Sequence, residues 1–123
     1  MADFQGIATQ FVAHYYTTFD AERKNLASLY RDDSKMTFES DQLAGASAIT
    51  DKLAGLPFQK VQHKYGGVDA QPTPTGAIVI LVTGQLVVDD STAPLSYSQT
   101  FVLGTDAAGG WYVQNDIFKL VVF

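Results

Sequence analysis

The segment from Asp3 to Phe19 has the most regular pattern in the chain and constrains its fold most strongly. Large apolar or aromatic residues recur there at spacings of three and four, the period of a helix with one apolar face. The stripe consists of Phe4, Ile7, Phe11, Val12, Tyr15, Tyr16 and Phe19, with Ala8 among them. Asp3 is a suitable N-cap because its carboxylate can accept from free amides of the first turn. A helix with so wide an aromatic face needs a concave partner.

Shorter elements are expected between this helix and the middle of the chain. They are a second helix beginning near Asp20, a polar turn over 31–34, a short strand over 35–40, an extended piece over 42–44 and a third helix over 46–56. Pro57 ends the third helix because the residue before a proline avoids helical geometry.

From residue 58 onward the sequence predicts only strands. Four long ones are expected over 58–71, 76–90, 95–105 and 110–123, separated by turns that contain Gly, Pro or Asp. Gly66 and the glycine after it predict a bulge or bend. Helices followed by strands indicate a single α+β domain, residues 1–123, with a mainly antiparallel sheet. A long, twisted, bent sheet would curl around the first helix and form a cone with an open mouth.

Two of the long strands are apolar on both sides. Residues 77–82 are apolar at every position, and Ile117 and Val121 alternate with Phe118 in the last strand. Helices cover one face of the sheet only, so the other face, with Leu81 and Ile117, is most simply buried against a second copy of the chain. Scattered exposed apolar residues are the ordinary alternative. The pattern favours a homodimer.

Composition argues against several classes of function. A net charge of −5 and a pI near 4.6 disfavour nucleic acid, which requires a basic patch. No apolar run approaches the ~20 residues of a membrane span, and no basic region precedes an apolar one as in a signal peptide. The chain has no cysteine and two histidines, so neither disulfides nor a structural zinc site is expected. No phosphate-loop or dinucleotide motif occurs, and no cofactor is expected.

Two residues inside the cone are candidates for acid–base chemistry. If Phe118 points inward, strand parity sends Asp116 inward too, while His63 shares a face with Val61. A His and an Asp that face each other in an apolar pocket can act as general acid and base, which predicts a small lyase or isomerase. The alternative is a hydrogen-bonded contact that joins two strands.

A second group of residues lies where strands end at the mouth. Its members are Phe38, Leu56, Val61 and Phe118 for an apolar hollow, and Glu39, Asp89 and Asp90 for an acidic rim. Glu39 is expected to alternate away from Phe38 without a role in packing. An apolar hollow edged with carboxylates suits a partner that inserts an aromatic side chain flanked by Lys or Arg. Acids at turns are more often simply solvated, so the pattern alone is a weak signal.

Several segments resemble the nuclear transport factor 2 family, and its fungal members in particular. They are HYY at 14–16, FD at 19–20, LY at 29–30, TFE at 37–39, LPFQKVQH at 56–63, DAQP at 69–72, TGQL at 83–86 and NDIF at 115–118. They run in family order across nearly the whole chain, and the octet at 56–63 is the most specific. The resemblance implies the cone-shaped α+β roll shared with cystatin-like proteins, and a homodimeric carrier without cofactor or enzymatic activity.

The resemblance also implies partners and a location. Such a carrier binds the small GTPase Ran in its GDP form and the Phe-x-Phe-Gly repeats of nuclear pore proteins, and returns Ran from cytoplasm to nucleus. It is expected in both compartments, concentrated at the nuclear pore. An aromatic side chain of Ran would enter the hollow, and basic residues of Ran would meet Glu39 and Asp89. Phe4 would help to bind the repeats.

Two features depart from the family pattern. Animal members have Trp where this chain has Phe38, and Trp near Phe4, so both positions keep an aromatic residue. The family often has a second acid two residues after the position of Asp89, whereas this chain has Ser91. Asp90 is the available replacement, although its side chain is expected to point the other way.

Overall fold

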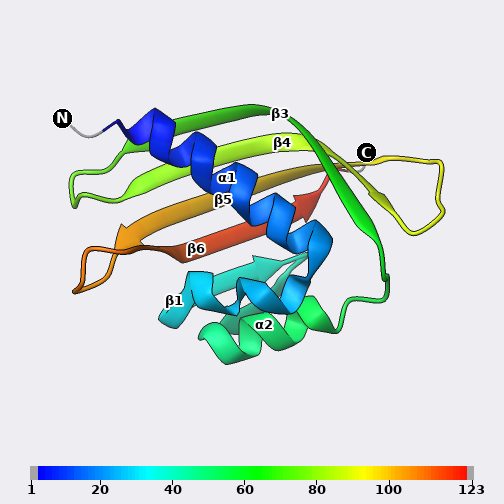
Figure 1. The fold of residues 1–123 in the computed structure, drawn as a ribbon, viewed down its shortest axis with the longest axis horizontal. Coiled ribbons are helices and arrows are strands. Elements are labelled where there is room, and N and C mark those ends of the chain that lie inside the picture. Colours follow the sequence, from blue (N-terminus) through cyan, green and yellow to red (C-terminus); the bar gives the residue numbers. More distant parts are fainter. Residues whose placement is uncertain (1–2, 122–123) are drawn as a thin grey trace.

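A computed structural model describes residues 3–121 of the chain. Its elements are α1 (Phe4–Ala21), the 3₁₀ helix η1 (Arg23–Leu29), β1 (Tyr30–Phe38), β2 (Asp41–Ala44), α2 (Ala46–Ala54), β3 (Val61–Pro72), β4 (Ile78–Val88), β5 (Leu95–Thr105) and β6 (Trp111–Leu120). The strands form one six-stranded sheet in the order β2-β1-β6-β5-β4-β3. The sheet curves around α1, which crosses it at a steep angle (Figure 1). The predicted α+β cone is confirmed.

The sheet is antiparallel except where β1 pairs with β6 in parallel. The predicted bulge in β3 lies between Tyr65 and Gly67. Opposite it, Gly84 of β4 leaves room for the bulged strand, because a Cβ there would lie 2.6 Å from the Tyr65 Cα and 2.7 Å from the Lys64 carbonyl oxygen. A side chain at Gly84 would therefore push the two strands apart at the bend.

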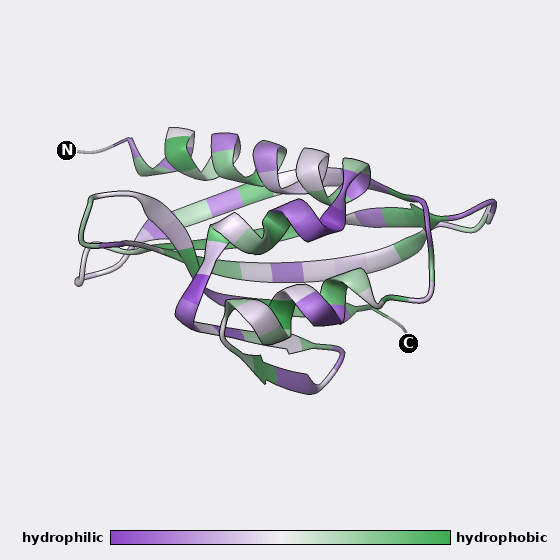
Figure 2. Ribbon diagram, turned by 60° about the horizontal axis from the view of Figure 1, so that its bottom comes forward, coloured by the Kyte–Doolittle hydropathy of each residue, from purple (hydrophilic) through white to green (hydrophobic). Residues whose placement is uncertain are grey.

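Helix α1 packs its aromatic stripe into the concave face of the sheet, as predicted. Asp3 caps it, accepting a hydrogen bond of 2.9 Å from the Gly6 amide. Tyr15 is fully buried, and its ring centroid lies 4.9 Å from that of Phe101 on β5. In Figure 2, apolar and polar residues alternate along α1, as expected of a helix with one buried face.

The segment between α1 and β1 differs from the prediction. The second helix, expected to begin near Asp20, is the 3₁₀ helix η1, which begins at Arg23 and in which only Leu26 is buried. The expected polar turn over 31–34 is wrong, because these residues belong to β1. Buried Ser34 accepts from the Arg31 amide at 2.8 Å and donates to the carbonyl oxygen of Val113 on β6. The register between β1 and β6 shifts at this point, and the Ser34 hydroxyl takes the place of backbone hydrogen bonds between the two strands.

Smaller differences concern the ends of the other elements. Helix α2 ends at Ala54, and β3 begins at Val61 rather than at residue 58. The last strand ends at Leu120; residues 122–123, which were predicted to extend it, lie outside the described residues. No helix within residues 3–121 is long and apolar enough to cross a membrane.

Candidate functional site

An apolar hollow opens at the end of the sheet where β1, β4 and β6 stop and β5 begins. It is lined by Phe38, Glu39, Leu56, Pro57, Phe58, Leu86, Val88, Leu95, Phe118 and Leu120. Of these described residues only Glu39 is charged. The hollow measures about 170 Å³, comparable with an apolar cavity of ~150 Å³ that binds benzene in an engineered protein. It can therefore hold one aromatic ring.

The floor of the hollow is a stacked pair of aromatic rings. The parallel register of β1 and β6 places Phe38 opposite Phe118, with ring centroids 4.7 Å apart and planes 10° apart. Beneath them lies an inner cavity of about 20 Å³, bordered by Val61 and His63 among others. That volume suffices for about one water molecule. This inner cavity thus has no room for a substrate, and the larger apolar hollow lies on the other side of the ring pair.

The sequence brings three of the four predicted apolar residues to this hollow. Phe38, Leu56 and Phe118 line it, whereas Val61 lines the inner cavity. Sequence reasoning did not assign the other apolar lining residues to the hollow: Pro57, Phe58, Leu86, Val88, Leu95 and Leu120. A signal for Phe58 existed: it directly follows Leu56 and Pro57, and the apolar and polar residues around it do not alternate as they would in a strand.

Glu39 contributes to the packing at the rim, so the expectation that it has no such role was wrong. It follows β1 with a φ of 50°, which ends the alternation of the strand. Its carboxylate Oε1 accepts from the Leu120 amide, and its own amide donates to the Phe118 carbonyl oxygen at 3.1 Å. Glu39 therefore joins the end of β1 to the end of β6 while it borders the hollow.

Asp89 is directed toward a neighbouring loop. It has a φ of 49°, and its Oδ1 accepts from the amides of Gln59 at 2.9 Å and Lys60 at 3.0 Å. The bonds from Lys60 and Gln59, in that order of size, hold the pKa of the carboxyl group below its ordinary value. Asp89 does not line the hollow, and Asp90 is exposed on the turn that follows. Glu39 is thus the acid placed closest to the hollow.

The predicted acid–base pair of His63 and Asp116 is not formed. His63 Nδ1 lies 2.7 Å from Asp20 Oδ1 at the end of α1, and the His63 amide donates to Asp20 Oδ2 at 3.0 Å. The His63 ring also stacks on Tyr16, with centroids 4.2 Å apart. No hydrogen bond joins His63 to Asp116 in the described part of the chain. Strand parity correctly placed both side chains on the inner face but could not identify their partners.

Asp116 is the acceptor of a buried network that the sequence did not reveal. It accepts from Tyr30 at 2.8 Å, Gln99 at 2.8 Å and Tyr15 at 3.3 Å. Burial raises its pKa to about 6, although these three donors oppose the rise. Burial, and then the charge of Asp116, raise the pKa of Tyr15 and Tyr30 well above 10.0, so both keep their hydroxyl protons. The network joins α1, β1, β5 and β6.

The remaining predicted residues lie away from the hollow. Phe4 is partly buried at the start of α1 and packs against the core. Leu81 and Ile117 are 44% and 52% exposed. Thr100 on β5 pairs with Leu81 on β4 and with Ile117 on β6, so these two side chains lie on the same, outer face of the sheet. Within residues 3–121, no cluster of three or more His, Asp or Glu side chains is placed to hold a metal ion.

The sequence model of the nuclear transport factor 2 domain matches residues 7–120. The chain belongs to this family. Nuclear transport factor 2 of Neurospora crassa is 68% identical over 120 residues, which cover 98% of this chain and 97% of the relative. Nuclear transport factor 2 of Emericella nidulans is 53% identical and covers 98% of both chains. The structure of nuclear transport factor 2 from Cryptosporidium parvum has a TM-score of 0.91 and 41% identity, over 96% of this chain and 94% of that one.

Membership of the nuclear transport factor 2 family confirms the resemblance drawn from the sequence. Both fungal relatives are named as transport factors rather than as enzymes. In the structure, the two side chains considered for acid–base chemistry are hydrogen-bonded to other partners, His63 to Asp20 and Asp116 to Tyr30.

Proposed function

We propose that this chain is a nuclear transport factor that binds GDP-bound Ran at the apolar hollow and carries it into the nucleus. The observation that supports this most directly is the hollow itself, which has room for one aromatic ring and a single bordering carboxylate, Glu39. That combination fits a partner in which a Lys or Arg stands next to the aromatic residue that enters the hollow. The names of the fungal relatives support the same role.

The contacts with Ran divide into an apolar and a charged part. The aromatic side chain of Ran packs against Phe38, Leu56 and Phe118, and Val61 supports these residues from the inner cavity. Glu39 meets a basic residue directly. Asp89 and Asp90, at the end of β4, add negative potential beside the hollow and favour encounter with a basic surface.

The proposal includes a homodimer that also binds Phe-x-Phe-Gly repeats. The exposed apolar residues Leu81 and Ile117 support a second copy on the outer face of the sheet. Phe4, only partly covered by its own chain, is proposed to take up a repeat phenylalanine near the dimer boundary. A carrier with both activities works in the cytoplasm, in the nucleus and at the nuclear pore between them.

Binding of Ran in its two nucleotide states tests the proposal. Immobilised protein is incubated with purified Ran loaded with GDP or with a non-hydrolysable GTP analogue, and the retained Ran is quantified. We expect retention of the GDP form only. Equal retention of both forms, or of neither, would overturn the proposed function.

A further inference from the structure

The loop between α2 and β3 forms one wall of the hollow but has no regular structure. Leu56, Pro57 and Phe58 line the hollow, and residues 56–60 belong to no helix or strand. Backbone groups outside a ladder need other partners, and an unsupported loop would sample several conformations. The position of this wall therefore depends on contacts from elsewhere in the chain.

Arg23, the first residue of η1, contacts both the backbone and the ring of Phe58. Its Nη2 donates to the Phe58 carbonyl oxygen at 2.7 Å. Its guanidinium carbon lies 4.9 Å from the centroid of the Phe58 ring and 6.0 Å from that of Phe19 on α1. A planar guanidinium can hydrogen-bond and lie over a ring at the same time. One side chain thus sets the position and the orientation of Phe58.

In the part of the chain that the structure describes, no other polar contact of the Arg23 side chain accounts for its position beside Phe58. Among residues 3–121 it forms no ion pair, and its Nη1 is buried without a hydrogen-bond partner. A buried donor without a partner is unfavourable for stability. On the far side of Phe58, Asp89 holds the next two residues, Gln59 and Lys60, through their amides. Arg23 and Asp89 together hold three successive residues of the loop.

We infer that Arg23 is a positioning residue of the hollow, which holds Phe58 in place as a wall for the incoming aromatic side chain. The inference rests on the proposed function, because it takes the hollow as the partner site. Arg23 acts through Phe58 and need not touch the partner. Its loss lowers the fraction of molecules with a formed wall, and the apparent affinity falls by the same factor.

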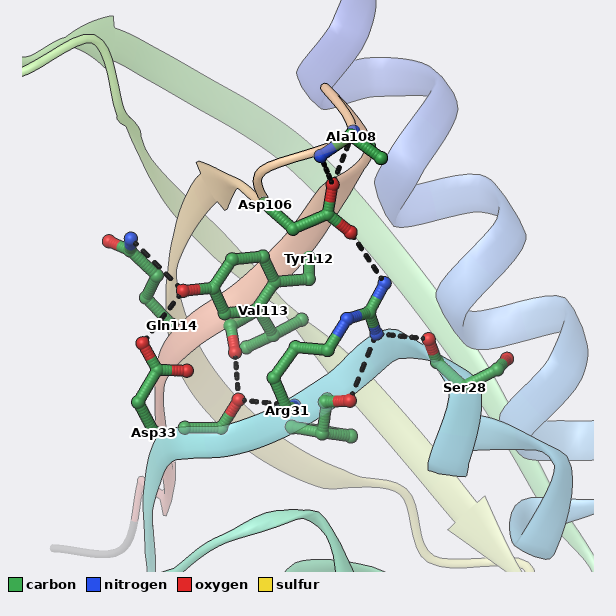
Figure 3. Close-up of polar contacts among 11 residues, drawn as sticks. Ser28, Arg31, Asp33, Asp106, Ala108, Tyr112, Val113 and Gln114 are labelled. Atoms are coloured by element: carbon green, nitrogen blue, oxygen red, sulfur yellow. Dashed lines mark hydrogen bonds and ion pairs between the residues drawn. The ribbon is translucent and has the colours of Figure 1, made fainter.

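The test compares Arg23→Met with a matched control, Arg31→Met. Methionine keeps an apolar stem but removes the charge and the donors. Arg31 resembles Arg23, because it donates to the Ser28 carbonyl oxygen at 2.6 Å and lies 5.4 Å from the centroid of the Tyr112 ring. It also pairs with Asp106 beyond the end of β5 opposite the hollow (Figure 3). Both variants lose one positive charge, but only Arg23 contacts the wall.

Affinity for GDP-bound Ran is measured by calorimetry, and the Phe58 ring is followed by NMR in the free protein. We expect Arg23→Met to weaken binding ~10-fold or more, as for a wall formed in about a tenth of molecules. Its Phe58 ring signals should shift and the amides of residues 58–60 should exchange faster. Arg31→Met should change affinity less than ~2-fold and leave Phe58 unchanged. Wild-type affinity of folded Arg23→Met, or weaker binding with unchanged Phe58 signals, would overturn the inference.

A second comparison tests whether Arg23 acts through the ring. If it does, Arg23→Met combined with Phe58→Leu should bind no more weakly than Phe58→Leu alone, whereas additive losses would contradict the inference. Should Arg23→Met fail to fold, Arg23→Lys keeps the charge but lacks the planar fork. It should then show a smaller change in the same direction, and wild-type values in both measurements would refute the role. If wild-type protein does not bind Ran, the proposed function fails, while the Phe58 signals still decide what Arg23 does.

Discussion

Variants of Glu39 separate its contact with Leu120 from its proposed contact with Ran. Oε1 of Glu39 accepts from the Leu120 amide, while Oε2 has no hydrogen bond within residues 3–121 and is available to a partner. Glu39→Gln keeps an oxygen acceptor on a side chain of the same length but removes the charge. Glu39→Lys removes the acceptor and reverses the charge. The pair therefore distinguishes a loss of structure from a loss of attraction.

The effect on stability follows from one hydrogen bond at an exposed position. A typical intramolecular hydrogen bond contributes about 0.5–1.5 kcal/mol, and water can replace part of it at the surface. For a chain of this size Glu39→Lys should lower the melting temperature by about 2–5 °C. Glu39→Gln should differ from wild type by less than about 2 °C, because the acceptor remains.

The effect on binding is larger and differs between the two variants. Glu39→Lys places two like charges in contact in the complex, at a cost of several kcal/mol, which corresponds to a ~100-fold or greater loss of affinity. Glu39→Gln removes the attraction only, and we expect a loss of ~10-fold. Neither variant should impair binding of Phe-x-Phe-Gly peptides.

Calorimetric titration with GDP-bound Ran at two salt concentrations measures these effects. Asp32→Lys is the matched control, because Asp32 is exposed on β1 and the change in net charge is the same as for Glu39→Lys. It should bind within ~2-fold of wild type. Wild-type affinity of a folded Glu39→Lys protein would refute the assignment of the hollow as the Ran site. If Asp32→Lys and Glu39→Lys lost equal affinity for Ran, the effect would come from the net charge of the protein and not from a contact at Glu39.

Three further predictions concern the dimer, the repeats and the buried network. Ile117→Glu should convert dimers to monomers in light scattering, because it places charges in the proposed interface; wild-type protein that is monomeric at micromolar concentration would contradict the interface. Phe4→Ala should weaken binding of Phe-x-Phe-Gly peptides and leave Ran binding intact, whereas parallel loss of both with thermal stability would make Phe4 a core residue. Asp116→Asn should flatten the pH dependence of unfolding. The wild-type carboxyl group, with a folded pKa of about 6 against an ordinary 3.8, binds more protons when folded, so its contribution is lost as pH rises through 6. If the free energy of unfolding of wild type and Asp116→Asn changed with the same slope between pH 4 and 7, the raised pKa of Asp116 would be refuted.

The sequence predicted those features that depend on local patterns. The spacing of apolar residues and the N-cap Asp3 identified α1. Both signals lie within a few residues of each other, because one concerns the buried face of the helix and the other the free amides of its first turn. The bulge in β3 was predictable from its glycines, although the reason for it, the close approach of Gly84, lies on the next strand. The extension of β1 through 31–34 was not predictable, because Ser34 is satisfied by Val113, far away in sequence.

Partners of buried polar groups were the part that local patterns could not supply. Strand parity placed His63 and Asp116 on the inner face, and both face inward. Parity does not say which side chain stands opposite, and here the nearest partners came from other elements: Asp20 on α1 for His63, and Tyr30 on β1 for Asp116. A sequence pattern therefore identifies a buried polar residue before it identifies its chemistry.

The rim acids show where strand parity itself stops applying. Glu39 and Asp89 each follow directly after a strand, and both have a positive φ, so the side chain is no longer directed by the alternation of the strand. The turned backbone lets each carboxylate reach amides of a neighbouring segment. Glu39 accepts from Leu120, and Asp89 accepts from both Gln59 and Lys60. Carboxylates held in this way lose little freedom when a partner binds, because their rotamers are already restricted. Sequence reasoning could place both acids at the rim, but it could not find these amide contacts, which restrict the two carboxylates before any partner is present.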